Sequence, residues 1–380
     1  MREWPMVKLG ELLKPSPKKA AGELEAPILS ITMHDGLVEQ GTRFKKRIAS
    51  LDTSIYRIAF KGQLVVGFPI DEGVLDFQDK YSQALVSPAY GVWDLVSDEV
   101  TPEFLGLFLK SPRAISIYKS RLRGTTARRR SLPTKVFQEI EFPLPPLGEQ
   151  KRIAEILGGV SKAIHVVEQQ IETTNQLEKS LFNQFRRQYS ALCSPIKNMC
   201  KVQTGATPSR KNSSYYDGGI PWVKTGEVNG GKIEETEEYI TELAIQETNC
   251  RKFPIGTILV AMYGQGATRG KVGILNCAAA TNQACAALIA LACEDQEYIF
   301  AVLRNCYDEL RNLGRGGTQP NLNLTLVKNF EIPWPEEFAR EEFSQKWREL
   351  DNLRHLLHRK LSLLQELQKS LATRAFAGLL

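Results

Sequence analysis

The residues of this 380-residue chain that could carry out chemistry do not have the spacing that an enzyme requires. The stretch YGQGATRGKVG, from Tyr263 to Gly273, is the nearest approach to a phosphate-binding P-loop. Its Gly266 and Gly270 enclose three residues rather than the four of a P-loop, and Val272 stands where the magnesium-binding hydroxyl belongs. We therefore interpret this stretch as a loop between two strands.

Metal-dependent chemistry and methyl transfer have no better support. His355 and His358 lack the glutamate of an HExxH zinc motif, and the seven cysteines form no CxxC pair. The stretch PIDEGVLDFQDK (69–80) lacks the strand-separated carboxylates of a metal-dependent nuclease, so a surface loop is expected there. The chain contains no Asn-Pro-Pro or Asp-Pro-Pro sequence of the kind with which amino-methyltransferases hold a target base. We expect no metal site.

The composition is that of a globular chain with unevenly distributed positive charge. Apolar residues make up 42% of the chain, and no leader or apolar run of about 18 residues is present. The odd number of cysteines favours reduced thiols and a cytoplasmic location. The net charge is +6, yet the window from Phe104 to Gln138 holds nine Lys or Arg residues and no acid. Such a window is either a solvated surface helix with its loop or a face that attracts polyanions.

The chain repeats one plan at an interval of 190 residues. Pro143 corresponds to Pro333, and QLEKSL (176–181) corresponds to ELQKSL (366–371). The interval drifts to 194 inside each half, where GQLVVG matches GTILVA. Because the intervals hold across separate landmarks, we interpret the chain as a tandem duplication.

Each copy is predicted to be a globular part followed by a long helix. Short β runs such as GTILVAMYG alternate with glycine and proline turns, and each copy also contains at least one helical stretch. The predicted fold class is α/β with mixed sheets, rather than a regular βαβ series. The predicted organisation is a globular domain at 1–145, a helix at 146–190, a second globular domain at 191–335 and a second helix at 336–380.

Apolar residues at alternating spacings of four and three run along both predicted helices. The first seam is Ile153, Leu157, Val160, Ile164, Val167, Ile171, Thr174, Glu178, Leu181 and Phe185. The second seam is Phe343, Trp347, Leu350, Arg354, Leu357, Leu361, Leu364, Gln368, Leu371 and Ala375. A helix of about 40 residues is about 60 Å long and must bury such a stripe, so each helix is expected to pack on its duplicate. The result would be an intramolecular antiparallel coiled coil that separates the globular domains with internal pseudo-two-fold symmetry; an interaction coiled coil of unknown purpose is the alternative.

Several stretches resemble one known family. PLPPLGEQKRIAEIL (143–157) resembles the signature that follows a target-recognition domain in the specificity subunits of type I restriction-modification enzymes. TGATPSRKNSSYYDGGIPWVKTGEV (204–228) and AATNQACAAL resemble the body of the second recognition domain. QKSLATRAFAGLL resembles the usual C-terminus, so the resemblance covers essentially the whole chain. The second copy departs from the pattern, because IPWPEEFAREEF replaces the proline-GEQ signature, and this suggests two unequal docking faces.

The resemblance implies a subunit that recognises double-stranded DNA and is itself non-catalytic. Each globular domain would read one half of a bipartite site, while the helices set the spacing and dock two modification subunits. Those methyltransferase subunits would use S-adenosylmethionine, so this chain would bind no cofactor, and two restriction-translocase subunits would complete the enzyme. The alternative is a non-catalytic coiled-coil scaffold that binds nucleic acid without sequence preference.

The candidate DNA contacts lie in polar loops that contain glycine or basic residues. Glycine lets the backbone approach a phosphate, whereas Arg on guanine or Gln on adenine would read bases directly. The candidates are Arg43, Lys45, Lys46, Arg123, Thr125, Thr126, Arg128, Arg129 and Arg130 in the first copy, and Ser209, Arg210, Lys211, Gln265, Thr268, Arg269, Lys271, Arg315, Thr318 and Gln319 in the second. The candidate spacer and docking residues are Glu149, Gln150, Ile153, Leu157, Ile164, Ile171, Leu181, Trp347, Leu350, Leu357, Leu364 and Leu371. Tyr215, Tyr216 and Trp222 are expected to pack in turns or core instead of stacking on bases.

Overall fold

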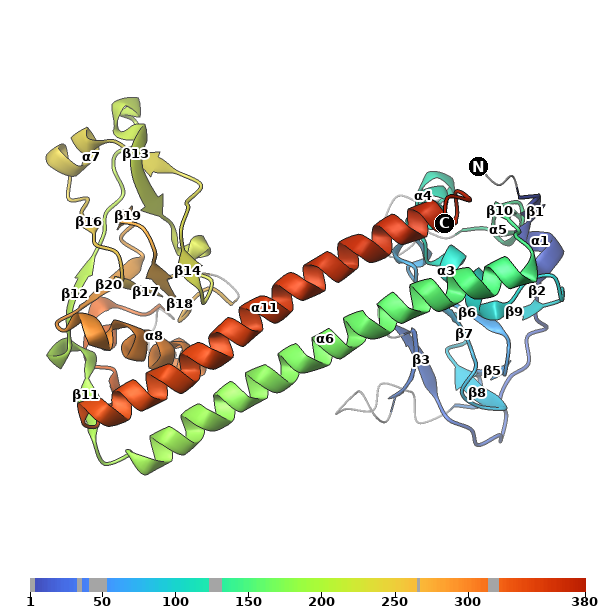
Figure 1. Cartoon of the computed structure of the whole chain (residues 1–380), viewed down its shortest axis with the longest axis horizontal. Helices are drawn as coiled ribbons and strands as arrows, with labels where there is room; N and C mark the ends of the chain where they lie inside the picture. The colour runs from blue at the N-terminus through green and yellow to red at the C-terminus, as the bar shows by residue number, and fades with distance from the viewer. Residues whose placement is uncertain (1–3, 33–35, 41–52, 123–131, 265–266, 314–320) are drawn as a thin grey trace. The chain divides into compact units, whose positions relative to one another are not determined.

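The structure, a computed structural model, describes residues 4–32, 36–40, 53–122, 132–264, 267–313 and 321–380. Internal contacts divide the chain into two compact units, which can be followed by colour in Figure 1. The first unit combines Met1–Gln169 with Arg359–Leu380, and the second unit is Gln170–His358. Each unit therefore contains a globular part and one segment of each long helix.

The first unit is built on a four-stranded sheet of order β2-β9-β6-β7, with two-stranded pairs β1–β10, β3–β4 and β5–β8 beside it. The strands are β1 (Met6–Lys8), β2 (Leu13–Pro15), β3 (Leu29–Thr32), β4 (Gly36–Glu39), β5 (Arg57–Phe60), β6 (Leu64–Val66), β7 (Leu75–Phe77), β8 (Gln83–Val86), β9 (Gly91–Leu95) and β10 (Glu141–Pro143). The helical elements are α1 (Leu9–Leu12), η1 (Ile70–Glu72), α3 (Pro102–Leu109), α4 (Pro112–Arg121), α5 (Thr134–Gln138) and the first part of α6 (Leu147–Gln188).

The second unit is built on a five-stranded sheet of order β12-β20-β17-β18-β14 and a four-stranded sheet of order β15-β13-β19-β16. The strands are β11 (Cys193–Pro195), β12 (Cys200–Thr204), β13 (Tyr216–Val223), β14 (Lys232–Ile233), β15 (Tyr239–Ile240), β16 (Lys252–Phe253), β17 (Ile258–Ala261), β18 (Val272–Leu275), β19 (Ala279–Thr281), β20 (Cys285–Ala290) and β21 (Glu331–Pro333). The helical elements are η3 (Ile196–Asn198), η4 (Ser213–Tyr215), η5 (Thr225–Glu227), α7 (Glu242–Glu247), η6 (Cys293–Asp295), α8 (Gln296–Asn305), α9 (Tyr307–Leu313), α10 (Leu324–Lys328) and the first part of α11 (Glu337–Ala375).

The two sheets have the same order once equivalent strands are matched. Strands β2, β9, β6 and β7 of the first unit correspond to β12, β20, β17 and β18 of the second. Gly62 and Gly256 precede the equivalent strands β6 and β17 with left-handed φ values of 87° and 83°. The predicted duplication and the α/β class are therefore confirmed. The named strands of the first unit pair only antiparallel, whereas both larger sheets of the second unit are mixed.

Capping residues determine where the helices beside the first sheet begin. The Oγ1 atom of Thr101 accepts a hydrogen bond from the Phe104 amide at 3.3 Å, and Pro102 is the first residue of α3. Phe104 and Phe108 of this helix are fully buried in one core with Leu64 of the sheet. The cap therefore fixes the register in which α3 covers the sheet.

The long helices α6 and α11 have 42 and 39 residues, and within the second unit they pack antiparallel. The rings of Phe185 and Phe343 lie 4.5 Å apart between centroids. Glu178, two turns earlier in α6, accepts hydrogen bonds from Trp347 Nε1 at 2.9 Å and from Arg354, which both come later in α11. The predicted seam is confirmed here, and its polar step is a buried acid paired with a buried arginine.

Within the first unit the other ends of the two helices also lie together. Gln368 Nε2 donates to Ser161 Oγ at 2.8 Å across the seam. Beyond the last turn of α11, Phe376 is 3% exposed, with its ring centroid 5.7 Å from that of Phe104 and 5.3 Å from that of Phe108. The end of α11 thus completes the core of a unit that begins at the other end of the chain.

No helix among the described residues is long and apolar enough to cross a membrane. Each of the seven cysteines is a free thiol. Burial raises the pKa of Cys200, Cys285 and Cys306 to about 12, so these thiols stay protonated at neutral pH.

Candidate nucleic-acid interface

Three connections of the second unit leave the five-stranded sheet at the same end. The register pairs Thr204, the last residue of β12, and Val260 of β17 with Ala286 near the start of β20. The ends of β12 and β17 and the beginning of β20 therefore coincide. The connections that meet there are 205–211, 262–271 and 282–284.

Hydrogen bonds tie these connections to one another. Met262 N donates to the carbonyl oxygen of Ala284 at 2.8 Å, and Thr207 Oγ1 donates to Gln283 Oε1 at 2.5 Å. Leu322 N donates to the carbonyl oxygen of Met262 at 3.1 Å. Leu322, the second described residue after 314–320, therefore also lies at this end of the sheet.

The β17–β18 connection is anchored on α9. Gly270 has a left-handed φ of 85°, and a Cβ atom built there would lie 2.9 Å from the Arg311 amide nitrogen. Tyr307 OH donates to the carbonyl oxygen of Ala267 at 2.8 Å and accepts from Arg311 Nη1 at 2.6 Å. This connection carries three residues predicted from the sequence, Thr268, Arg269 and Lys271. All three are half-buried, and Arg269 Nε is buried without a hydrogen-bond partner among the described residues.

Arg210 contacts two aromatic rings and an acid of the second unit, although its side chain is 56% exposed. Its guanidinium carbon lies 4.5 Å from the ring centroid of Tyr216 and 5.3 Å from that of Trp222. Its Nη1 atom is 2.6 Å from Glu238 Oε2. This hydrogen bond raises the pKa of Arg210 and lowers that of Glu238. Arg210 is therefore paired within the chain, and it is exposed like its neighbours Ser209 and Lys211.

Tyr216 and Trp222 belong to the packing of the second unit, as the sequence predicts. Trp222 is 2% exposed, and its Nε1 atom donates to the carbonyl oxygen of Ala206 at 3.1 Å. Tyr216 OH donates to the carbonyl oxygen of Pro208 at 2.6 Å. Both rings thereby fix the chain that leads into the 205–211 connection.

The first unit presents an equivalent end of its sheet with different charges. Gly73, with a left-handed φ of 75°, ends the β6–β7 connection as Gly270 ends the β17–β18 connection. That connection carries Asp71 and Glu72 in η1, where the second unit has basic residues. Nearby, Arg57 donates to the carbonyl oxygen of Tyr90 at 2.8 Å and bridges the start of β9 to the end of β2.

The acidic stretch at 69–80 has structural roles in the first unit. Asp76 lies in β7, where Oδ1 is 2.7 Å from Lys110 Nζ and Oδ2 accepts from the Leu37 amide at 3.2 Å. Among the described residues no group of three or more His, Cys, Asp or Glu side chains is arranged to hold a metal ion.

Many of the residues predicted to contact DNA lie outside the described residues, namely Arg43, Lys45, Lys46, Arg123, Thr125, Thr126, Arg128, Arg129, Arg130, Gln265, Arg315, Thr318 and Gln319. Their flanks are described. Helix α4 ends at Arg121, before the segment 123–131, and α9 ends at Leu313, before 314–320. The two undescribed segments therefore follow equivalent helices in the two copies.

Sequence reasoning missed two polar residues at this interface. Asn282 and Gln283 join β19 to β20, and Gln283 is exposed beside Thr207. An Asn-Gln pair between two buried, alanine-rich strands was the available signal, because such a polar pair must sit at a strand end.

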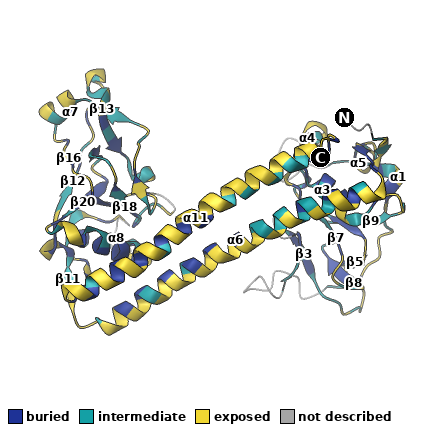
Figure 2. Cartoon of the chain, in the orientation of Figure 1, coloured by how far each residue is buried: buried dark blue, intermediate teal, exposed yellow. Residues whose placement is uncertain are grey.

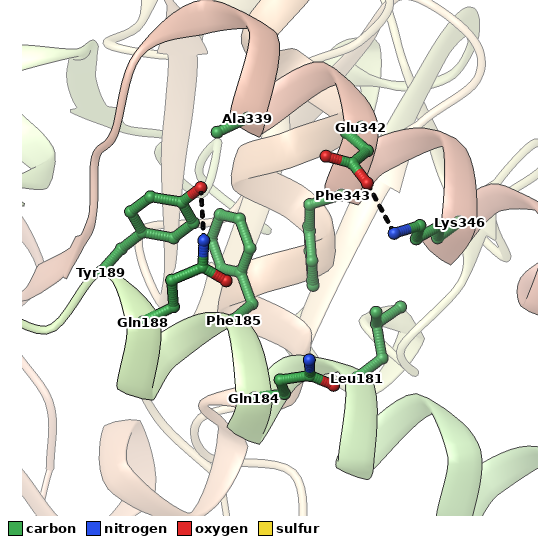
Figure 3. Close-up of a pocket in the computed structure, with 9 residues that line it drawn as sticks. All are labelled: Leu181, Gln184, Phe185, Gln188, Tyr189, Ala339, Glu342, Phe343 and Lys346. Carbon is green, nitrogen blue, oxygen red and sulfur yellow. Dashed lines mark hydrogen bonds and ion pairs between the residues drawn. The ribbon is translucent and has the colours of Figure 1, made fainter.

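Ten of the twelve predicted spacer residues are buried or half-buried in the seam between the long helices, and Figure 2 shows how burial alternates along both helices. The buried members are Ile153, Leu157, Ile171, Trp347 and Leu357, and the half-buried members are Ile164, Leu181, Leu350, Leu364 and Leu371. Figure 3 shows Phe185 and Phe343 facing each other at a pocket between the two helices, with Leu181 on its rim. The seam residues therefore pack against one another within the chain, and a docking partner must contact other residues of the helices.

Gln150, which was predicted for docking, has no exposed surface. Its side chain forms hydrogen bonds with Thr101, Glu99 and Pro145, because an amide buried at a helix start must satisfy both its donor and its acceptor. Glu149 is half-buried and pairs with Arg152 at 2.8 Å.

Four of the exposed apolar residues of the long helices follow the duplication, whereas Leu147, Phe338, Leu353 and Leu363 do not. Val166 and Leu356, at an interval of 190, are 50% and 65% exposed. Leu177 and Leu367, at the same interval, are 53% and 46% exposed. Eleven residues are close to three helical turns, so Val166 and Leu177 share one face of α6, and Leu356 and Leu367 share the equivalent face of α11.

These features define a class of protein: a duplicated binding protein with two related α/β domains, each with polar loops at one end of a sheet, and a pair of long helices. Comparison with known proteins gives the family. The type I restriction modification DNA specificity domain matches residues 1–178 and again 193–365. The chain therefore belongs to the family of type I restriction-modification specificity subunits and carries two DNA specificity domains.

Individual relatives agree with this family. The chain is 30% identical over 163 residues to the type I restriction enzyme MjaIX specificity subunit of Methanocaldococcus jannaschii, across 42% of this chain and 37% of that protein. It is 24% identical over 301 residues to the MjaVIII specificity subunit of the same organism, across 72% of this chain and 69% of that protein. A crystal structure of the type I restriction-modification S subunit from M. genitalium shares the fold, with a TM-score of 0.62 at 15% identity, over 98% of this chain and 96% of that one.

Proposed function

We propose that this chain is the non-catalytic DNA-recognition subunit of a type I restriction-modification complex, in which each globular domain reads one half of a bipartite site. The observation that carries this proposal is that the polar connections after β12, after β17 and before β20 meet at one end of the second sheet, next to the Gly270 turn. The first sheet has an equivalent turn at Gly73, which ends the β6–β7 connection. Polar loops on a rigid sheet can contact both phosphates and base edges.

The two domains would read different half-sites because their loops differ in charge. The β17–β18 connection presents Arg269 and Lys271, while the equivalent β6–β7 connection presents Asp71 and Glu72. Basic residues favour phosphates and guanine, whereas a carboxylate can accept from the cytosine amino group. An asymmetric bipartite site follows from this difference.

The long helices would serve as the spacer and as the docking surface for two methyltransferase subunits. The exposed pairs Val166 with Leu177 and Leu356 with Leu367 supply two equivalent apolar faces, which suits two copies of one partner. Those partners would bind S-adenosylmethionine and methylate adenine, and two restriction-translocase subunits would add DNA cleavage. This chain would bind no cofactor.

A competition experiment tests the proposal. The chain is assembled with the modification subunits from the same genome, and its target is read from the methylated adenines of cells that express the complex. The assembled complex should then bind the bipartite duplex about a thousandfold or more tightly than a scrambled duplex of equal length. Equal binding to both duplexes would instead support the non-specific scaffold.

A further inference from the structure

The start of each long helix is held by one side chain at matched positions. In the first unit Gln150 Nε2 donates to the carbonyl oxygens of Pro145 at 2.8 Å and Glu99 at 2.7 Å. Its Oε1 atom accepts from the Thr101 amide at 2.9 Å. Because Thr101 caps α3, this one amide joins the proline turn, the long helix and the first helix of the globular domain.

Arg340 occupies the same place in the second unit with different chemistry. It lies 190 residues after Gln150, and its Nη1 atom donates to the carbonyl oxygen of Pro335 at 2.7 Å. Its Nε atom donates to Asp295 Oδ1 at 2.8 Å, and its guanidinium carbon lies 4.3 Å from the Trp334 ring centroid. Asp295 directly precedes α8 as Thr101 precedes α3. A nearly buried ion pair thus replaces the neutral amide contacts. The altered signature of the second copy reflects this replacement, because Arg340 stands where the first copy has Gln150.

Further charged contacts join α8 and α9 to the long helices in the second unit. Arg304 of α8 lies 2.8 Å from Asp351 of α11, Arg348 Nε of α11 donates to Glu297 of α8 at 2.8 Å, and Arg186 of α6 pairs with Glu309 of α9. Asn305 of α8 donates to Glu178 of α6 at 3.3 Å. These charged contacts add to the ring packing of Tyr298 and Phe300 of α8 on Phe343 and Trp347 of α11.

In the first unit, apolar contacts and neutral hydrogen bonds join the globular part to the long helices. Phe376 packs on Phe104 and Phe108 of α3, and Arg113 of α4 donates to the Phe376 carbonyl oxygen at 3.0 Å. Between described residues no ion pair joins α3 or α4 to α6 or α11. Among the described residues, ion pairs therefore accompany the apolar packing only in the second unit.

We propose that Arg340 and Asp295 are the positioning residues of the second recognition domain. The pair fixes the angle between α8 and the start of α11, and with it the place of the reading loops relative to the helix pair. A charge-assisted bond of the planar guanidinium is directional, so it constrains this angle more tightly than apolar packing does. The inference rests on the proposed function, because its consequence is the number of base pairs that the complex accepts between the half-sites.

The test replaces the charged pair of the second unit by the neutral residues that stand at the same positions in the first unit. Arg340→Gln and Asp295→Thr each introduce the residue type of the first copy alone, and the double variant removes both nearly buried charges together. Arg348→Gln is the matched control, since Arg348 also pairs from α11 to α8 but is 56% exposed. Arg340→Lys keeps a positive charge beside Asp295 but loses the second guanidinium nitrogen that donates to the Pro335 carbonyl oxygen. Arg340→Lys replaces Arg340→Gln as the test variant if Arg340→Gln does not fold.

The measured quantity is the affinity of the chain, assembled with its modification subunits, for duplexes that differ in the gap between the half-sites. Duplexes with both half-sites unchanged and the gap shortened or lengthened by one base pair are compared with the natural spacing. We expect the preference for the natural gap to fall about tenfold or more in Arg340→Gln, Asp295→Thr and Arg340→Lys, because each leaves a buried polar group unpaired. The double variant and Arg348→Gln should keep the wild-type preference.

Two results would overturn the inference: single variants that fold and keep the natural gap preference, or a folded double variant that loses it. If the Arg340–Asp295 pair only stabilised the fold, the single variants would lower the melting temperature without changing the gap preference. If the wild-type complex does not distinguish the bipartite duplex from a scrambled one, the proposed function fails instead. The two failures are thereby separated.

Discussion

Gly73 and Gly270 show how single residues place the loops at the ends of the two sheets. Both adopt left-handed φ values at the end of equivalent connections, and both approach the helix that precedes an undescribed segment. A Cβ on Gly73 would lie 3.7 Å from the nearest atom, Ile115 Cδ1, which is ordinary contact. A Cβ on Gly270 would meet backbone of Arg311 at 2.9 Å, so this position tolerates no side chain without movement.

Gly270→Ala should therefore displace the β17–β18 connection from α9. We expect a loss of about 1–3 kcal/mol of stability from the strained φ and the backbone clash, together with weaker binding of the specific duplex. Thermal unfolding and titration of the assembled complex measure both effects.

Gly219→Ala is the matched control, since Gly219 has ordinary backbone geometry and nothing within 4 Å of its Cβ position. Gly73→Ala should lose less stability than Gly270→Ala, because only its φ is strained. Equal stability of Gly270→Ala and Gly219→Ala would show that the α9 contact is not restrictive.

Arg269 and Lys271 are expected to contact phosphates, whereas Arg210 is engaged by Glu238 within the chain. Changing Arg269 and Lys271 together to Ala should reduce the slope of log affinity against log salt by about one to two, because each lost phosphate contact removes about 0.9. Arg210→Ala should leave that slope unchanged and lower the melting temperature instead. Binding titrations from low to moderate salt provide the slopes, and identical slopes for all three proteins would remove the β17–β18 connection from the phosphate-contacting surface.

The long helices divide their apolar residues between an internal seam and an exposed face. Two neighbouring leucines of α11 show the division, because Leu357 is 8% exposed and Leu356 is 65% exposed. A residue in the seam stabilises the chain itself, while an exposed apolar residue that recurs in both copies has a partner as its most direct explanation.

Leu357→Ala should destabilise the chain by about 2–4 kcal/mol through the cavity it leaves in the seam, whereas Leu356→Ala should change the stability by less than about 0.5 kcal/mol. Leu356→Ala should instead weaken assembly with the modification subunits. Denaturant unfolding measures the first effect, and sedimentation of the mixed subunits measures the second. Full assembly by Leu356→Ala together with Leu367→Ala would exclude this face as the docking surface.

At the scale of the whole molecule, the two copies share one architecture and differ in the charged residues of their loops and helix starts. The sheet order, the turn glycines and the helix starts agree between the copies, while the loop charges and the joints at Gln150 and Arg340 differ. Shared architecture with separate loops allows each half-site to change without altering the other, which is expected of a reader of bipartite DNA.

If the helices set the spacing, lengthening both should change only the gap. Inserting four residues into each helix adds about 6 Å, which should lengthen the unread gap by about one or two base pairs. The methylated sites of cells that carry the variant would reveal the new gap, with the half-sites unchanged. Altered half-sites at the original gap would contradict a spacer role.

The sequence predicted the features that depend on periodicity. It did not predict features that depend on a contact with a residue far away in the chain. The seams from Ile153 and Phe343 follow from regular apolar spacing, and the polar step at Glu178 was visible as an interruption. The neutralisation of Arg210 by Glu238 depends on two turns that pack together, and spacing along the chain does not encode this contact. Gln150 was misplaced for the same reason, because its burial requires α3 and the proline turn at once.

The position of Phe376 has a consequence for synthesis on the ribosome. Residues 4–122 emerge long before the segment that fills the space beside Phe104 and Phe108 has been translated. The second unit is contiguous and can fold as soon as it emerges, so the half of the protein that is made first should be the last to acquire its native state, and chaperones would meet it with an open core.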